Sequence, residues 1–214
     1  MSYFTIRNDG YFEFEEKKSK FIGRARRVYT EVEAKAFIEE VNMLNKDARH
    51  NVYAYVIGEK FNIERYNDDG EPQGTAGIPM LQTIKKINVT DVVVVVTRYF
   101  GGILLGTGGL ARAYSKAASM ALKEGDIVEK VLGVRVDIKV SYELLGKLQY
   151  AFEQKNWHIE NIEYTDKVNA IVFCETTELD KIKNTVVQVS SGSCFFKIEQ
   201  EKYYFKNENR LFLE

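Results

Sequence analysis

A run of five valines followed by a cluster of glycines constrains the fold of this 214-residue chain more than any other feature. The stretch from Asp91 to Tyr114 reads DVVVVVTRYFGGILLGTGGLARAY. Consecutive β-branched residues favour a buried strand, and residues 110–123 have a helical pattern that stops at Gly125. The sequence therefore predicts a buried strand, a glycine-rich turn and a helix in direct succession.

Glycine-rich turns between a strand and a helix often bind phosphates, but two familiar nucleotide motifs do not fit here. No glycine of the turn is followed by Gly-Lys at the spacing of a P-loop. Residues 106–111 match G-x-G-x-x-A, but several residues separate them from the end of the strand, and Asp126 follows the helix rather than a strand. Two roles remain for the glycines: close packing of helix on sheet, or a backbone wall for an anion.

The composition is that of a folded protein without a membrane segment. Apolar residues make up 45% of the chain, and the longest apolar run, residues 92–96, is far too short to span a bilayer. No basic segment followed by an apolar stretch marks a signal peptide at the N-terminus. Cys174 and Cys194 form no C-x-x-C motif, so we expect two reduced thiols. These features predict a cytoplasmic protein with no metal, no cofactor and no membrane partner.

Charge also limits the kind of partner. The net charge is −1, so binding of nucleic acid requires a local basic patch rather than overall basicity. One candidate is KKSKFIGRARRV, where strand alternation places Lys20, Arg24 and Arg26 on one face. That face is either a solvated sheet surface or a surface that binds RNA phosphates. Sequence-specific DNA binding is not expected.

The chain divides into two α+β modules, and the first covers residues 1–130. A capping box at Thr30 and Glu33 predicts the start of its first helix. Asn67-Asp68-Asp69-Gly70 predicts a turn. Further helices are expected at residues 77–87 and 110–123, and strands at residues 11–14, 20–28, 51–57 and 61–66 and in the valine run.

The second module covers residues 131–214 and has the predicted order strand, helix, strand, strand, helix, strand. Ser141 and Thr177 are the expected N-caps of its two helices, which run to residue 155 and over residues 179–189. The strands are expected at residues 131–140, 157–164 and 168–175 and from Cys194 onward. This βαββαβ pattern predicts a ferredoxin-like domain, a fold that serves too many functions to define one.

Residues that could carry chemistry lie in the first module. Asp68, Asp69 and Glu71 place three carboxylates within four positions, which suits either a binding site or simply a turn. Arg98 is the only charged residue in the valine strand and the glycine turn. A buried arginine requires a carboxylate or an incoming anion. We therefore expect the acidic turn and the end of the strand to be neighbours in space.

A ligand site at this junction would bind a phosphate or a nucleic-acid backbone. The glycines would supply a wall of backbone N–H groups at the start of the helix, and Arg112 would add a second cation. No nucleophile and base with a recognisable local signature occur, so no catalytic residue is predicted. The candidate ligand-binding residues are Asp68, Asp69, Glu71, Arg98, Tyr99, Gly101, Gly102, Gly106, Gly108, Gly109 and Arg112.

Two long motifs, DDGEPQGTAGIPML and VVVVVTRYFGGILLGTGGLARAYSKAA, resemble the signature of the YigZ/IMPACT family. The segments KKSKFIGRA, ARHNVYAYVIG and LLGKLQY match as well, so the resemblance covers nearly the whole chain. It implies a first domain similar to the second domain of a small-subunit ribosomal protein and to one domain of elongation factor G. The smaller C-terminal domain is expected to resemble a ferredoxin-like domain of elongation factors.

The resemblance also implies a link to translation. Eukaryotic IMPACT proteins regulate translation initiation by binding the activator of an amino-acid-sensing kinase, which bacteria lack. We therefore expect a translation-associated protein whose N-terminal domain binds RNA, the ribosome or a translation-regulating protein, without catalysis. The alternative is an enzyme that acts on a phosphorylated small molecule or nucleotide at the acidic turn and the glycine-rich loop.

Overall fold

The computed structural model describes residues 2–213 and consists of two compact α+β units, each built on an antiparallel sheet. The N-terminal unit is Tyr3–Val128, and the C-terminal unit comprises residues 129–213 together with Ser2. A two-domain α+β organisation was predicted from the sequence. Within the described residues, no helix is long and apolar enough to cross a membrane.

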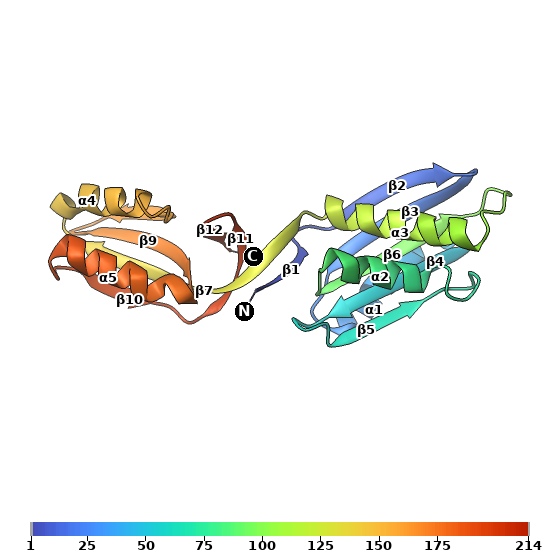
Figure 1. Cartoon of the computed structure of the whole chain (residues 1–214), viewed down its shortest axis with the longest axis horizontal. Coiled ribbons are helices and arrows are strands. Elements are labelled where there is room, and N and C mark those ends of the chain that lie inside the picture. The colour runs from blue at the N-terminus through green and yellow to red at the C-terminus, as the bar shows by residue number, and fades with distance from the viewer. Residues whose placement is uncertain (1, 214) are drawn as a thin grey trace. The chain divides into compact units, whose positions relative to one another are not determined.

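The N-terminal unit has a central sheet with helices on both faces (Figure 1). The sheet order is β2-β3-β6-β4-β5, and all neighbouring strands are antiparallel. Its elements are β1 (Ser2–Ile6), β2 (Gly10–Glu16), β3 (Ser19–Arg27), α1 (Glu31–Leu44), β4 (His50–Ile57), β5 (Ile63–Asn67), α2 (Gly77–Ile87), β6 (Val92–Tyr99) and α3 (Thr107–Glu124).

The central position of β6 explains the run of valines. Val92, Val94 and Val96 belong to the core that α2 and α3 cover, whereas Val93 and Val95 pack in the core beneath α1. A strand with helices on both sides has no polar face, so its apolar residues are continuous rather than alternating. Side chains continue to point alternately to the two faces of the sheet after the valines, so successive residues at the end of β6 lie on opposite faces.

Two helix starts in this unit bear on the site. At α1, Thr30 Oγ1 accepts a hydrogen bond of 3.2 Å from the Glu33 backbone N–H, as the predicted capping box requires. Helix α3 begins at Thr107, three residues before the predicted start. Gly106 is its N-cap with a φ of 74°, a conformation that glycine adopts without strain, so the helix extends back into the glycine cluster.

The C-terminal unit has helices α4 and α5 on one face of its sheet (Figure 1). The sheet order is β12-β11-β7-β9-β8, and β10 pairs with residues 136–139 of β7 beyond the segment that pairs with β11. Its elements are β7 (Ile127–Val140), α4 (Tyr142–Glu153), β8 (Asn161–Tyr164), β9 (Val168–Glu175), a 3₁₀ turn (Thr176–Glu178), α5 (Leu179–Ser190), β10 (Phe195–Ile198), β11 (Lys202–Asn207) and β12 (Arg210–Phe212).

Several sequence predictions for this unit differ from the structure: α4 ends at Glu153 rather than at residue 155, and β11 and β12 follow β10 where a single last strand was expected. Strand β8 begins at Asn161 rather than at residue 157, because the Trp157 ring turns inward and packs edge-on against Phe152 at 5.4 Å. Thr177 lies within the 3₁₀ turn, so it is not the N-cap of α5. Ser141 is the N-cap of α4, but its side chain makes no capping hydrogen bond.

Candidate functional site

A cavity of about 460 Å³ lies in the N-terminal unit where β6 ends and α3 begins. Its floor is formed by the buried residues Glu71, Arg98 and Leu110. Its rim includes the more exposed residues Arg49, Phe100 and Leu104. The acidic turn and the strand end were predicted to be neighbours, and both contribute to this cavity, which we call the Arg98 cavity.

A buried ion pair joins the two sequence motifs. Arg98 Nη1 lies 2.6 Å from Glu71 Oε1, and the two residues are only 5% and 8% exposed. The Tyr114 hydroxyl donates to the same Glu71 oxygen at 2.8 Å. Burial, and secondly the charge of Glu71, raise the pKa of Tyr114 far above its ordinary value, so the hydroxyl keeps the proton that it donates.

Arg98 does not use all its hydrogen-bond donors. Besides the bond to Glu71, Nη2 has a long contact of 3.4 Å with Ser19 Oγ. Among the residues that the structure describes, Nε has no hydrogen-bond partner. A guanidinium group carries five N–H donors, and unused buried donors are costly. This arginine on the cavity floor therefore keeps a buried donor that no described residue satisfies.

His50 adds a second polar group to the cavity. Its Nδ1 lies 2.7 Å from the backbone carbonyl oxygen of Asp69. A carbonyl oxygen can only accept, so Nδ1 carries a hydrogen and Nε2 is the nitrogen left for other contacts. Nε2 lies 3.8 Å from Glu71 Oε1. His50 was not among the predicted ligand-binding residues, and only the fold shows its place beside Arg98.

Asp68 and Asp69 bind backbone N–H groups and do not line the Arg98 cavity. The carboxylate of Asp68 accepts from the N–H groups of Gly74, Ala76 and Gly77 at 2.8, 3.1 and 2.7 Å, which fixes the start of α2. The carboxylate of Asp69 accepts from the Asn51 N–H at 2.6 Å. In the described residues, no group of three or more metal-ligating side chains is assembled.

Tyr99 and Arg112 lie outside the Arg98 cavity. Tyr99 follows Arg98 in β6, so strand alternation points its ring to the opposite face of the sheet, where its hydroxyl donates to Asn45 at 3.1 Å. Arg112 is exposed on α3 and borders two other hollows. The cavity therefore contains three of the predicted ligand residues, Glu71, Arg98 and Gly106.

The remaining glycines have distinct positions. Gly101 packs so tightly that an added Cβ would lie 1.8 Å from the backbone oxygen of Lys18. Gly102 has a φ of 83° in open space, so it serves the backbone conformation of the turn. Gly108 and Gly109 form the first turn of α3 and do not line the Arg98 cavity.

The start of α3 differs from the starts of α1 and α2. No side chain caps Gly106, and the first turn of α3 contains no acidic residue. By contrast, Thr30 caps α1 and Asp68 binds the N–H groups at the start of α2. The first N–H groups of a helix have no partner within it and carry a partial positive charge. Gly106 and Thr107 bring this uncapped start to the wall of the Arg98 cavity.

Further cationic side chains line two hollows beside α3. A hollow of about 230 Å³ shares Leu105 with the cavity, and a hollow of about 470 Å³ lies between α2 and α3. Their basic residues, which we call the α3 cationic surface, are Lys17 after β2, Lys86 of α2, and Arg112 and Lys116 of α3; one carboxylate, Glu16, lines the smaller hollow as well. None of the four forms an ion pair with another described residue.

The basic face of β3 is mostly neutralised by carboxylates. Arg24 lies over the ring of Tyr11, 5.3 Å from its centre. The other two predicted phosphate-binding residues form ion pairs: Lys20 with Glu13 at 3.0 Å, and Arg26 with Asp9 at 2.7 Å and with Glu40 at 2.6 Å. This face therefore offers less free positive charge than the α3 cationic surface.

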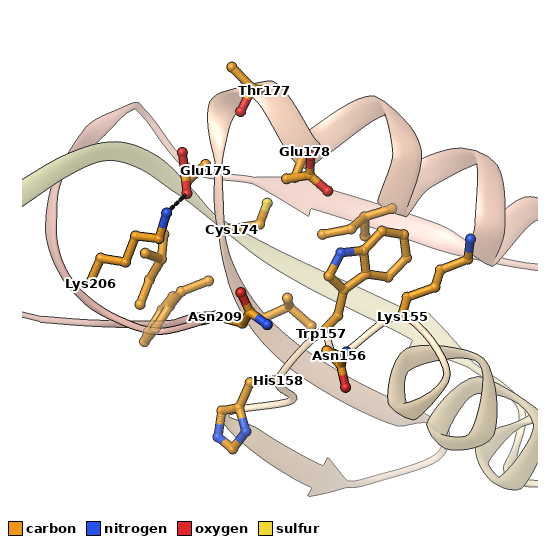
Figure 2. Close-up of a pocket in the computed structure, with 14 residues that line it drawn as sticks. Lys155, Asn156, Trp157, His158, Cys174, Glu175, Thr177, Glu178, Lys206 and Asn209 are labelled. Carbon is orange, nitrogen blue, oxygen red and sulfur yellow. Dashed lines mark ion pairs between the residues drawn. The ribbon is translucent and has the colours of Figure 1, made fainter. Parts of the chain in front are cut away.

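The C-terminal unit also has a pocket, of about 310 Å³, that sequence reasoning missed (Figure 2). It is formed by the loop after α4, the end of β9, the start of α5 and the turn between β11 and β12, so no local motif marks it. Lys206 lies 2.7 Å from Glu175, the ion pair dashed in Figure 2, and Glu178 pairs with Lys181 at 2.6 Å. Burial raises the pKa of the Cys174 thiol to about 11, which disfavours the reactive thiolate.

Sequence comparison places this architecture in a known family. The Impact N-terminal domain family matches residues 17–122, which contain the Arg98 cavity and the α3 cationic surface. A second family, described as a domain of unknown function (DUF1949), matches residues 138–193 of the C-terminal unit.

Relatives match over most of the chain. "IMPACT family member YvyE" of Bacillus subtilis is 39% identical over 210 residues, covering 98% of this chain and 97% of the relative. "IMPACT family member YigZ" of Escherichia coli is 34% identical, covering 84% of this chain and 89% of the relative. A solved structure titled "Crystal structure of an hypothetical protein" has a TM-score of 0.58 and 31% identity, covering 91% of this chain and 96% of that chain. The chain belongs to the IMPACT family.

Proposed function

We propose that this chain is a cytoplasmic, translation-associated protein whose N-terminal unit binds RNA, free or within the ribosome, along the α3 cationic surface. The observation that carries this proposal is the group of four cations without ion pairs in the two hollows beside α3. Phosphates are the dominant partners of such surfaces, because their neutralisation releases condensed counterions. The membership in the IMPACT family agrees with a role in translation.

The folds of the two units support the same proposal. In the C-terminal unit, the strand order β10-β7-β9-β8 with α4 and α5 on one face agrees with the ferredoxin-like domain expected from the sequence. We also propose that the N-terminal unit is similar to the second domain of a small-subunit ribosomal protein and to one domain of elongation factor G. The C-terminal unit would then be similar to a ferredoxin-like domain of elongation factors. Such folds host many functions, so the fold adds support without defining the ligand.

The proposal is tested by RNA binding at several salt concentrations. Reversing two charges with Arg112→Glu and Lys116→Glu should weaken binding of a single-stranded RNA and lower the slope of log K against log salt by about 1.4, roughly 0.7 for each lost phosphate contact. Fluorescence anisotropy with a labelled RNA measures both quantities.

A matched control keeps the change in net charge but moves it. Lys35→Glu with Lys46→Glu places the same two reversals on and just after α1, at exposed positions that do not line the hollows beside α3. The control should retain most of the affinity. Equal losses in both double variants, or no RNA binding by the unmodified protein, would contradict binding along α3.

An enzyme acting on a phosphorylated small molecule is the second candidate, and His50 is the observation that favours it. With Nδ1 bonded to the Asp69 carbonyl, Nε2 of the neutral ring could accept a proton from a substrate in the Arg98 cavity. Asp68 and Asp69, however, bind backbone N–H groups instead of facing that cavity. Turnover of phosphate esters that is lost in His50→Gln would establish this candidate, and its absence would leave the binding function.

A further inference from the structure

The polar wall of the Arg98 cavity is suited to an anion. Arg98, whose Nε has no hydrogen-bond partner among the described residues, lies on the same cavity as the uncapped start of α3, and Arg49 stands at the rim. Glu71 neutralises one positive charge through its 2.6 Å pair with Arg98. The lining side chains and the helix start therefore leave a net positive charge.

An adjacent wall of the cavity is apolar and includes an aromatic ring. Phe100 is 39% exposed, and the guanidinium carbons of Arg98 and Arg49 lie 5.4 and 5.9 Å from the centre of its ring. Leu104, which also lines the cavity, is 82% exposed and so is accessible to a ligand. A ligand that satisfies both walls carries an anionic group and a flat apolar group, as a nucleotide does.

The burial of the cavity floor favours binding of the end of an RNA strand over binding of its middle. Arg98 and Glu71 are buried on the floor, whereas Arg49 and Leu104 are exposed at the rim. An internal phosphodiester has nucleotides on both sides and needs an open groove, whereas a terminal phosphate can enter a recess. A phosphomonoester also carries a second negative charge at neutral pH.

We propose that the Arg98 cavity binds a nucleotide that bears a phosphomonoester, as at the phosphorylated end of an RNA strand whose remaining phosphates contact the α3 cationic surface. The phosphate lies against Arg98 and the first N–H groups of α3, and the base packs on Phe100 and Leu104. This inference rests on the RNA binding proposed above and names the part of the RNA that the cavity takes.

The test compares one short single-stranded RNA in three forms: with a 5′-phosphate, with a 3′-phosphate, and with hydroxyl groups at both ends. The unmodified protein should bind one phosphorylated form about tenfold more tightly than the hydroxyl form, the gain of one charge-assisted hydrogen bond. The same titration with a nucleoside monophosphate and with the nucleoside reports on the cavity without the rest of the strand.

Removing Arg98 leaves Glu71 without its partner and risks unfolding, so the variant that tests the site is Thr107→Asp. An acidic residue in the first turn of α3 favours the helix but repels a phosphate. This variant should lose the preference for the phosphorylated forms while its melting temperature stays equal or rises. Ser141→Asp, which introduces the same charge at the N-cap of α4 in the other unit, should keep the preference.

The outcomes separate the two proposals. Equal binding of the three RNA forms, with no preference for the monophosphate over the nucleoside, would overturn the cavity proposal even if RNA binds along α3. A preference for the monophosphate that Thr107→Asp abolishes, without any RNA binding, would support the cavity and contradict the RNA function. Preference for phosphorylated RNA without monophosphate binding identifies an RNA end as the ligand.

Discussion

The two units each contain a pocket, and the pockets differ in how their polar groups are satisfied. In the C-terminal pocket, Lys206 pairs with Glu175, Glu178 pairs with Lys181, and the ammonium group of Lys155 lies over the Trp157 ring, so each of these charged groups contacts a neighbouring side chain. In the Arg98 cavity, the central arginine has an unpaired Nε, and the start of α3 has no capping side chain. Pocket volume alone therefore does not distinguish a candidate binding site from a structural hollow; unused donors do.

The largest expected difference between the pockets concerns the stability of their ion pairs. Glu71→Ala leaves the Arg98 charge buried and unpaired, so it should lower the free energy of unfolding by about 3–5 kcal/mol. Lys206→Met removes a cation from a pair whose side chains are 26% and 32% exposed, so the loss should stay below about 1 kcal/mol. Urea denaturation followed by circular dichroism measures both changes.

Tryptophan fluorescence shows which unit a substitution destabilises. Trp157 is the only tryptophan of the chain and lies in the C-terminal unit, so its fluorescence reports on the unfolding of that unit. Glu71→Ala should shift the transition seen by circular dichroism without moving the Trp157 transition. If Trp157 fluorescence moves by the same amount, the units unfold together and their stabilities cannot be compared separately.

Elements with strong local signals could be predicted from the sequence. The bounds of α2 and β9 match the predictions, because Asn88 ends α2 in a left-handed conformation and a turn precedes β9. The start of α3 could not be placed from pattern, since glycines usually disfavour a helix and here form its first turn. Strands β11 and β12 were missed because their pairing partners lie far away in sequence or across a tight turn.

The second difference lies in how the two units cap their helices. Asp68→Ala removes a carboxylate that accepts three backbone N–H groups, so it should cost about 2 kcal/mol. Ser141→Ala removes the N-cap side chain of α4, which makes no capping bond, so its effect should remain within about 0.5 kcal/mol. Thermal unfolding measures both. A loss of similar size in both variants would contradict this difference in capping.

The candidate site could be predicted from the sequence only where a buried charged residue requires a partner of opposite charge. Arg98, a lone charge after five valines, had to reach a carboxylate or an anion, and it reaches Glu71. The contribution of His50 could not be predicted, because β4 and the acidic turn meet only in the folded sheet. Tyr99 was predicted at the site by its position in the motif, although the period of a strand assigns it to the other face.

The smallest expected effects concern two glycines, one in each unit, and they have opposite signs. Gly102 has a φ of 83° with no atom near its missing Cβ, so Gly102→Ala meets no clash but forces alanine into a left-handed conformation, at a cost of about 1 kcal/mol. Gly146 lies inside α4 with open space around it, so Gly146→Ala should stabilise the C-terminal unit by about 0.5–1 kcal/mol. Circular dichroism should detect the first change and Trp157 fluorescence the second. A stabilising Gly102→Ala would mean that the turn before α3 relaxes to another conformation, and the wall of the Arg98 cavity would then lack the fixed backbone on which phosphate binding depends.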